Sequence, residues 1–396
     1  MAKLSTAVNR PHVPADGATV TAEIDVEPGA QTEAVQRQIV LCIDTSGSMG
    51  GEKLERAREG ASWVFGLLEP DDYVGIVGFE SAARVVMKPT RWGDTSREEA
   101  MGLVEDLSAG GGTDMYDGLE TARDQLTALD YVSDAENPVR RILLLSDGKD
   151  NSHEPADFAD LGADIDGTGV RILAAGIGDE YEEETIRTLG TTARGEWTHL
   201  EAAGDIEDFF GDAVEQAGSV VAPEATLELD VKAGSEVSEV YRALPQTQEV
   251  AVEWAANTAT VPLPDLAERE RQRVVLKLHA PSGEVGRTET VADVTLTARG
   301  ATASDSIDLE YTDDNEKLGV HNESVSIDHR QTVIRTELGK GNVEAAETEL
   351  ERMTVVHGEE TEQVQEADRQ TQLVKEGGRE EQSQATKIVT DDDRIA

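Results

Sequence analysis

The chain is 396 residues long, which is enough for two or three domains with substantial hydrophobic cores. Acidic side chains dominate its composition: 81 Asp and Glu residues stand against 35 Lys and Arg residues, for a formal net charge of -46. Because nucleic-acid binding depends on Lys and Arg side chains that neutralise phosphates, this balance excludes nucleic acid as a general partner.

The first 36 residues contain one predicted strand. Apolar side chains at Val20, Ala22, Ile24 and Val26 alternate with polar ones. This period of two is typical of a half-buried strand in an antiparallel sheet. A single strand is not stable by itself, so we expect its partners to lie far downstream in the chain.

Apolar runs and helix-like patterns alternate from residue 37 to residue 218. This alternation predicts a doubly wound, Rossmann-like α/β sheet with helices on both faces. The run from Arg84 to Lys88 is predicted to be an antiparallel strand at the edge of this sheet. The other expected elements are strands at 39–43, 73–79, 142–145, 170–177 and 196–200, and helices that begin near residues 54, 97, 115, 182 and 206.

Oxygen-bearing side chains follow two of these strands and one glycine-rich loop. Open α/β sheets bind ligands at the carboxyl ends of their strands, so we expect these side chains to share one site. Hard oxygen ligands that are completed by water suit Mg²⁺, and Mn²⁺ or Ca²⁺ accept overlapping ligand sets. The predicted metal ligands are Asp44, Ser46 and Ser48 after strand 39–43, Thr113 after the loop, and Asp147 after strand 142–145.

Three short motifs carry a resemblance to a known family. Asp44-Thr45-Ser46-Gly47-Ser48-Met49, Gly111-Gly112-Thr113-Asp114 and Ser146-Asp147-Gly148 resemble the metal-ion-dependent adhesion site (MIDAS) of von Willebrand factor type A (VWA) domains. The resemblance covers roughly residues 37–218, about half of the chain. It implies that Asp44 and the two serines ligate the metal, that Thr113 does so directly in one state, and that Asp147 acts directly or through water.

Other polar residues near these motifs have structural interpretations. Asp114 and Asp117 are predicted to be helix caps or to support the ligands from behind, and Asp150 and His153 to lie on a loop surface. The histidines show no zinc-ligand spacing. The serines of the first motif lack a nearby histidine base and lie in no GxSxG turn, so neither a zinc site nor acyl transfer is predicted.

The pattern changes after residue 223. Short alternating runs separated by turn residues span 223–312 and predict a β-sandwich. The strand within residues 1–36 would complete it, so that the α/β domain (37–218) is inserted in a discontinuous sandwich. Two amphipathic helices around a glycine turn predict a helical hairpin within 313–376, and the polar segment 377–396 is predicted to be a disordered tail.

The predicted site suggests protein binding. An open coordination position on a partly compensated cation attracts an external carboxylate, such as an Asp or Glu of a partner protein. The resemblance to VWA domains implies a metal-dependent module for protein interactions. We therefore predict a Mg²⁺-dependent binding or scaffold protein that is not an enzyme. Two alternatives stay open. One is a Mg²⁺-assisted hydrolase or phosphoryl-transfer enzyme; the other, which the resemblance implies, is an accessory subunit of a separate AAA+ ATPase of the MoxR or chelatase type.

Several features favour a cytoplasmic protein. The single cysteine, Cys42, lies in a predicted buried strand, where a thiol is inert packing and no disulfide can form within the chain. The N-terminal residues lack a signal-peptide core, and no apolar run approaches the ~20 residues of a membrane helix. Acidic residues are spread over every segment, which favours adaptation to a salt-rich cytosol in a halophilic, haloarchaeal-like source. An acidic surface for a basic partner is the alternative.

Overall fold

The computed structural model describes residues 2–31, 35–178, 180–250 and 252–387. These residues form two compact units. The first unit joins residues 1–30 to residues 224–396, and the second consists of residues 31–223. Each unit therefore has its own core, and the first is built from two separate stretches of chain.

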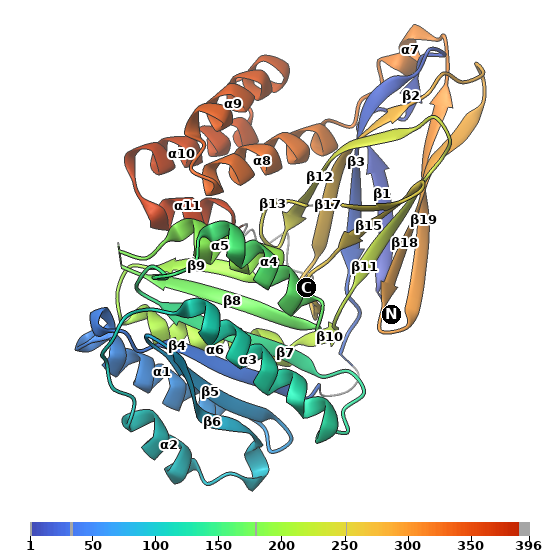
Figure 1. The fold of residues 1–396 in the computed structure, drawn as a ribbon. Helices are drawn as coiled ribbons and strands as arrows, with labels where there is room; N and C mark the ends of the chain where they lie inside the picture. Colours follow the sequence, from blue (N-terminus) through green and yellow to red (C-terminus); the bar gives the residue numbers. More distant parts are fainter. Residues whose placement is uncertain (1, 32–34, 179, 251, 388–396) are drawn as a thin grey trace. The chain divides into compact units, whose positions relative to one another are not determined.

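The second unit is built on a six-stranded sheet with the strand order β6-β5-β4-β7-β8-β9 (Figure 1). The strands are parallel except for β6, which runs antiparallel to β5 at one edge. Their bounds are β4 (Arg37–Asp44), β5 (Tyr73–Phe79), β6 (Ala83–Arg91), β7 (Val139–Ser146), β8 (Val170–Ile177) and β9 (Glu196–Leu200). The predicted doubly wound sheet and its antiparallel edge strand are confirmed.

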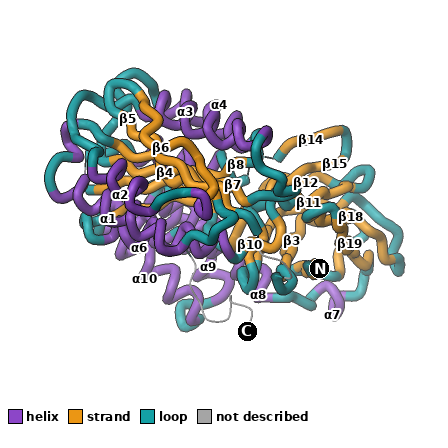
Figure 2. Tube along the Cα trace, turned by 90° about the horizontal axis from the view of Figure 1, so that it is seen from below, coloured by secondary structure: helices purple, strands orange, loops and turns teal. Residues whose placement is uncertain are grey.

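Helices cover both faces of this sheet (Figure 2). Ile39, Leu41 and Ile43 of β4 pack with the helices α1, α2 and α6, whereas Val40 and Cys42 pack with α3, α4 and α5. Because both faces are covered, all residues of β4 are buried, and its central residues 39–43 form an unbroken apolar run. The helices are η1 (Gly47–Met49), α1 (Glu52–Leu67), η2 (Trp92–Asp94), α2 (Arg97–Glu105), α3 (Met115–Thr127), η3 (Ala128–Tyr131), α4 (Pro155–Asp166), α5 (Glu183–Thr192) and α6 (Asp205–Gly218).

The first unit contains two antiparallel sheets. One has the order β1-β3-β17-β12-β13, and the other has the order β14-β15-β11-β18-β19-β2, in which only β2 runs parallel to its neighbour. Their strands are β1 (Lys3–Val8), β2 (His12–Val13), β3 (Ala18–Glu27), β11 (Thr226–Val231), β12 (Glu236–Leu244), β13 (Gln248–Glu249), β14 (Glu253–Ala255), β15 (Thr258–Pro262), β17 (Gln272–Ala280), β18 (Thr288–Ala298) and β19 (Ala301–Tyr311). Two further short strands of the chain are β10 (Val220–Ala222) and β16 (Leu266–Ala267).

The predicted N-terminal strand is β3, and it has a partner far downstream. Ile24 of β3 lies opposite Val274 of β17, in an antiparallel register that continues along both strands. On its other side β3 pairs with β1, which the sequence pattern did not predict. The expected long-range pairing therefore occurs, because a strand with two free edges gains hydrogen bonds on both sides.

Helices follow the last strand: α7 (Asn315–Leu318), α8 (Glu323–Gly339), α9 (Val343–His357), α10 (Glu362–Glu376) and α11 (Arg379–Ala385). Residues of α8 to α11 share one apolar cluster, so a four-helix group replaces the predicted two-helix hairpin. The predicted disordered tail from residue 377 is wrong for α11. The Gln246 side chain donates to Thr386 Oγ1 (2.8 Å) and Thr386 is buried, and such long-range contacts leave no local pattern. Residues 388–396 lie outside the described part of the chain.

A partly buried cluster of charged side chains lies where α8 meets the sheet that contains β3 and β17. Arg273 of β17 bonds to Asp25 of β3 (Nε–Oδ1, 2.8 Å) and to Asp328 of α8 (Nη1–Oδ2, 2.6 Å). Its Nη2 lies 3.3 Å from Glu23 Oε1. Burial raises the pKa of Glu23 to about 8, against the opposing attraction of Arg273. One guanidinium is thus surrounded by three carboxyl groups.

This cluster predicts a pH-dependent stability. Folded Glu23 keeps its proton up to about pH 8, whereas the unfolded chain loses it near the ordinary value of 4.5. The folded state therefore binds more protons between these pH values, and its stability falls as pH rises through this window. In Glu23→Gln the side chain stays neutral at every pH. At pH 9 the free energy of unfolding of the variant is therefore expected to exceed that of the wild type by on the order of 2 kcal/mol, and at pH 5 by much less. Urea unfolding at both pH values measures this; parallel pH profiles for the two proteins would contradict it.

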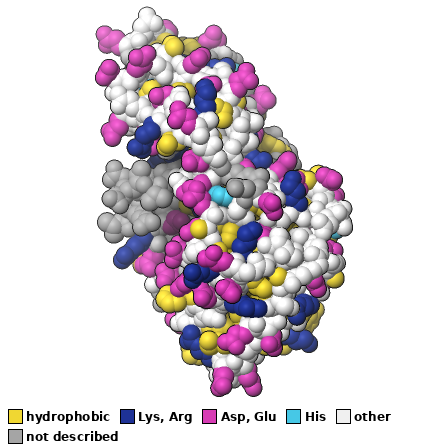
Figure 3. Space-filling model, turned by 90° about the vertical axis from the view of Figure 1, so that its left-hand side faces the viewer, with side chains coloured by type: hydrophobic (Ala, Val, Ile, Leu, Met, Phe, Trp, Pro, Cys, Tyr) yellow, Lys and Arg dark blue, Asp and Glu magenta, His cyan; other side chains and the backbone are white. Residues whose placement is uncertain are grey.

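Acidic side chains are spread over the surface. On the face drawn in Figure 3, Asp and Glu side chains are scattered among Lys, Arg and apolar groups and do not gather in one patch. Among the described residues, no helix is both long enough and apolar enough to cross a membrane.

Candidate metal centre

The first loop of the candidate site leaves the carboxyl end of β4. Asp44, the last residue of that strand, is fully buried. Its Oδ1 accepts a hydrogen bond from the Ser46 backbone N–H (2.7 Å), and its Oδ2 accepts one from Ser146 Oγ at the end of β7 (2.6 Å). Burial raises the pKa of Asp44, and the hydrogen bonds from Ser146 and Ser46 oppose this rise. The strand and these two bonds hold the carboxylate in one orientation.

A row of hydrogen bonds connects this loop to β7. Ser46 Oγ lies 3.0 Å from Ser48 Oγ, and Ser48 Oγ donates to Asp147 Oδ1 (2.7 Å). Asp147 is fully buried, whereas Ser48 is exposed. Four of the five predicted ligands therefore lie together, and Ser48 is the member of this row that solvent reaches.

The glycine-rich loop brings the fifth predicted ligand. Gly110 donates its N–H to the Thr45 carbonyl (2.9 Å), which ties this loop to the first one. Gly111 has a φ of +71°, a backbone conformation that favours glycine, and a Cβ there would also displace the Glu80 carboxyl group, whose Oε2 would lie 2.3 Å away. Beside Gly148, a Cβ would lie 3.3 Å from Thr113 Oγ1, 3.8 Å from Ser48 Oγ and 3.9 Å from Asp44 Oδ2. Oxygens of the first loop and of the glycine-rich loop thus lie around one point on the loop that follows β7.

The donor set fits a hard divalent cation. The five side chains offer carboxylate and hydroxyl oxygens and no nitrogen or sulfur, which matches the preference of Mg²⁺, Mn²⁺ and Ca²⁺. Two of these side chains, Asp44 and Asp147, are buried carboxylates. Buried carboxylates are costly without a positive partner, so the site is built to receive positive charge.

The sequence interpretation missed one residue of this site, Lys53 in the first turn of α1. Its Nζ donates to Asp147 Oδ2 at 2.5 Å. Local periodicity could not predict the contact, because Asp147 follows Lys53 by 94 positions. The available signal is that α1 begins close to the metal motif, so its first turn starts beside the site.

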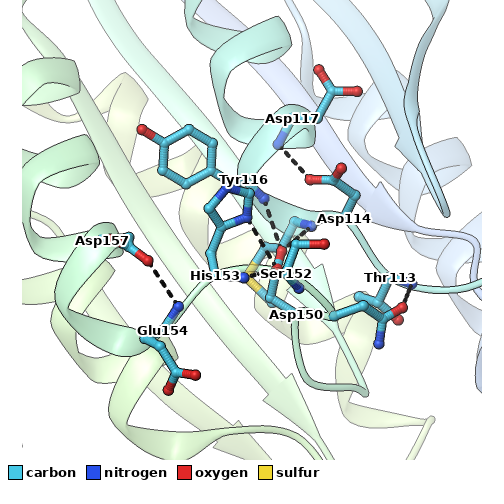
Figure 4. Close-up of polar contacts among 11 residues, drawn as sticks. Thr113, Asp114, Tyr116, Asp117, Asp150, Ser152, His153, Glu154 and Asp157 are labelled. Carbon is cyan, nitrogen blue, oxygen red and sulfur yellow. Dashed lines mark hydrogen bonds and ion pairs between the residues drawn. The ribbon is translucent and has the colours of Figure 1, made fainter.

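A second group of polar side chains lies next to the centre (Figure 4). The ligand atoms of Asp114, Asp150 and His153 lie within 4.8 Å of one another. Asp114 is the N-cap of α3, as predicted, because its Oδ1 accepts from the Asp117 N–H (3.0 Å). Each member of the group also has partners that do not involve a metal.

Asp150 differs from its predicted surface role. Its side chain is buried, and its Oδ2 accepts from the backbone N–H groups of Met115 (2.8 Å) and Tyr116 (3.2 Å) at the start of α3. Its Oδ1 accepts from the His153 N–H (2.8 Å), and the His153 ring stacks on Tyr116 at 4.2 Å. The first N–H groups of a helix lack partners within the helix, and here a distant loop provides the acceptor.

Comparison with known proteins shows that the central segment is similar to a known domain family. Residues 38–212 match the model of the von Willebrand factor type A domain. An uncharacterised protein of Synechocystis sp. is 23% identical over 61% of this chain and 56% of its own length. The inter-alpha-trypsin inhibitor heavy chain H3 of Mesocricetus auratus is 30% identical over 30% of this chain and 14% of its own. The chain thus spans about half or less of these relatives.

Two solved structures share the fold over nearly the whole chain. A von Willebrand factor type A protein from Catenulispora acidiphila superposes with a TM-score of 0.82 at 19% identity, covering 98% of this chain and 97% of that one. The ArnB paralog VWA2 from Sulfolobus acidocaldarius has a TM-score of 0.66 at 17% identity, covering 97% of both chains. At these identities the likeness concerns the fold alone.

Proposed function

We propose that this chain is a Mg²⁺-dependent protein-binding or scaffold protein. The premise is that residues 38–212 are a von Willebrand factor type A domain. VWA domains are commonly interaction modules, and many bind a divalent metal at a MIDAS. The observation that carries the proposal is the row of hydrogen bonds from Ser46 through Ser48 to Asp147, next to buried Asp44.

The metal would be held by Asp44, Ser46, Ser48, Thr113 and Asp147, with Mn²⁺ or Ca²⁺ as alternatives to Mg²⁺. When bound, it supplies a positive coordination position that accepts an external oxygen anion. The side chains orient that position, because Asp44 and Asp147 are buried behind it and Ser48 is exposed beside it. The partner group that this arrangement favours is an Asp or Glu carboxylate of another protein.

The geometry favours binding over catalysis. The hydroxyls of Ser46 and Ser48 bond to each other and to Asp147, so neither is paired with a histidine base. The relatives described above carry no catalytic name. A metal-dependent hydrolase is therefore the weaker alternative. An accessory role beside a separate AAA+ ATPase is compatible with the binding function, and we place both roles in the cytoplasm.

We also propose that the two sheets of the first unit form a β-sandwich in which the VWA domain is inserted. Hydrogen bonds between the sheets support this proposal. The N–H and Oγ1 of Thr6 in β1 both donate to Asp305 Oδ2 of β19, at 2.8 and 3.0 Å. The chain enters the first unit with residues 1–30 and returns to it at residue 224.

Affinity capture in high-salt buffer tests the binding function. Immobilised wild-type protein is expected to retain a specific protein partner in Mg²⁺ and to release it in EDTA. Ser48→Ala, which removes one hydroxyl from an exposed position, is expected to retain at least about tenfold less of the same partner. Quantitative mass spectrometry of the eluates measures this loss. If neither EDTA nor Ser48→Ala reduced the retention of the partner, the proposal would be contradicted. Mg²⁺-dependent turnover of a substrate by the isolated protein would favour the hydrolase.

A further inference from the structure

We propose that Lys53 is a built-in counter-ion of the candidate metal centre: its ammonium group holds the metal-free site together and competes with the cation for Asp147. This inference rests on the proposed function and adds a residue that sets metal affinity. No member of the MIDAS-like motifs provides this positive charge, since all five predicted ligands carry oxygen.

Lys53 and Ser48 donate to different oxygens of the Asp147 side chain. Lys53 Nζ donates to Asp147 Oδ2 at 2.5 Å, while Ser48 Oγ donates to the other oxygen, Oδ1, at 2.7 Å. Behind it, a Cβ at Gly178 would lie 3.9 Å from Nζ, so the ammonium lies close to the loop that follows β8. The Lys53–Asp147 contact thus joins the first turn of α1 to the loop that follows β7.

This contact is not an ordinary surface ion pair. The side chain of Asp147 is 0% exposed, and that of Lys53 is 32% exposed. Exposed pairs contribute little because water screens them, whereas a buried carboxylate without a partner is strongly unfavourable. In the metal-free protein, Lys53 is therefore the positively charged partner of this buried side chain.

Charge counting shows why the same contact weakens metal binding. Asp44 and Asp147 contribute two negative charges and Lys53 one positive charge, which leaves -1 before the metal binds. A divalent cation would bring the site to +1, so the ammonium repels the metal and must give up its contact with Asp147 if that oxygen becomes a ligand. The resulting +1 favours an anionic group from a partner.

Lys149 provides a matched control. It follows Asp147 by two positions, its side chain is 61% exposed, and its Nζ lies 3.8 Å from Glu182. Substitution of either lysine by methionine removes one positive charge near the site and retains most of the aliphatic side chain. Only Lys53→Met removes the contact with the buried carboxylate.

Calorimetric titration with Mg²⁺ alone, on the full chain, tests the proposal, together with melting curves in EDTA. Lys53→Met is expected to bind Mg²⁺ about tenfold more tightly than the wild type and to melt several degrees lower in EDTA, whereas Lys149→Met changes both by much less. Equal Mg²⁺ affinity in wild type and Lys53→Met would overturn the inference and leave the proposed function standing. If neither protein binds Mg²⁺, both fail; binding by Lys53→Met alone would support the role of Lys53.

Discussion

Replacing Asp44 by asparagine is expected to weaken Mg²⁺ binding by at least about 100-fold, because even residues that only support a metal ligand contribute 10- to 100-fold. The amide introduced by Asp44→Asn keeps the shape of the side chain, and it can still accept from the Ser46 N–H while donating to Ser146 Oγ. The substitution removes a carboxylate that is fully buried in the metal-free protein. The EDTA-treated variant is therefore expected to be more stable than the wild type, by on the order of 1 kcal/mol.

Two measurements on the same samples check this result. Calorimetric titration with Mg²⁺ reports metal affinity, and melting curves in EDTA and in Mg²⁺ report the stability of each state. Added Mg²⁺ should raise the melting temperature of the wild type and leave that of Asp44→Asn unchanged. Asp124→Asn is the control, because it removes the same charge from an α3 side chain that is 65% exposed. If Asp44→Asn bound Mg²⁺ as tightly as the wild type, Asp44 would not be a ligand of the metal.

The second large effect is expected at Arg273, far from the metal centre in sequence. Arg273→Met leaves the carboxyl groups of Glu23, Asp25 and Asp328 without their shared cation. Breaking a buried ion pair by removing one partner costs about 3–5 kcal/mol. Because the side chains of Asp25 and Asp328 are 19% and 28% exposed, the first unit should lose stability near the lower end of this range, about 3 kcal/mol.

Hydrogen exchange localises this loss. Amides of β3, β17 and α8 are expected to exchange much faster in Arg273→Met, whereas those of β4 and β7 keep their wild-type rates. Lys232→Met serves as the control, because Lys232 also bonds to two aspartates but its side chain is 37% exposed. Faster exchange in β17 with unchanged exchange in β3 would show that residues 1–30 do not depend on the downstream sheet.

Local patterns predicted the α/β domain well for a physical reason. A parallel strand covered on both faces is mostly apolar, so β4 and β8 were recognisable from their apolar residues at 39–43 and 172–177. Ligand-bearing turns follow such strands at the carboxyl edge. The sequence therefore placed Asp44 and Asp147 at one edge of the sheet, and the structure brings them together through Ser48.

Elements that depend on distant contacts were not predicted. Helix α4 and strand β1 were missed, and α11 was predicted to be disordered although Ala385 and Thr386 are buried. The side chains of β1 and α11 show weak local periodicity, whereas α4 does carry local signals, with Pro155 in its first turn and Phe158, Leu161 and Ile165 on its buried face. What stabilises β1 and α11 is the surface that another part of the chain offers, and no short window of sequence contains that information.

The amino-acid sequence alone determined the fold class of residues 37–218, the acidic character of the chain and the identity of the five candidate ligands. Only the tertiary structure decided which charges meet. It set Lys53 against Asp147, Asp150 against the start of α3, and Arg273 among three carboxyl groups. The reason is that the energy of a charge depends on its burial and on its neighbours within a few ångströms, and folding creates both.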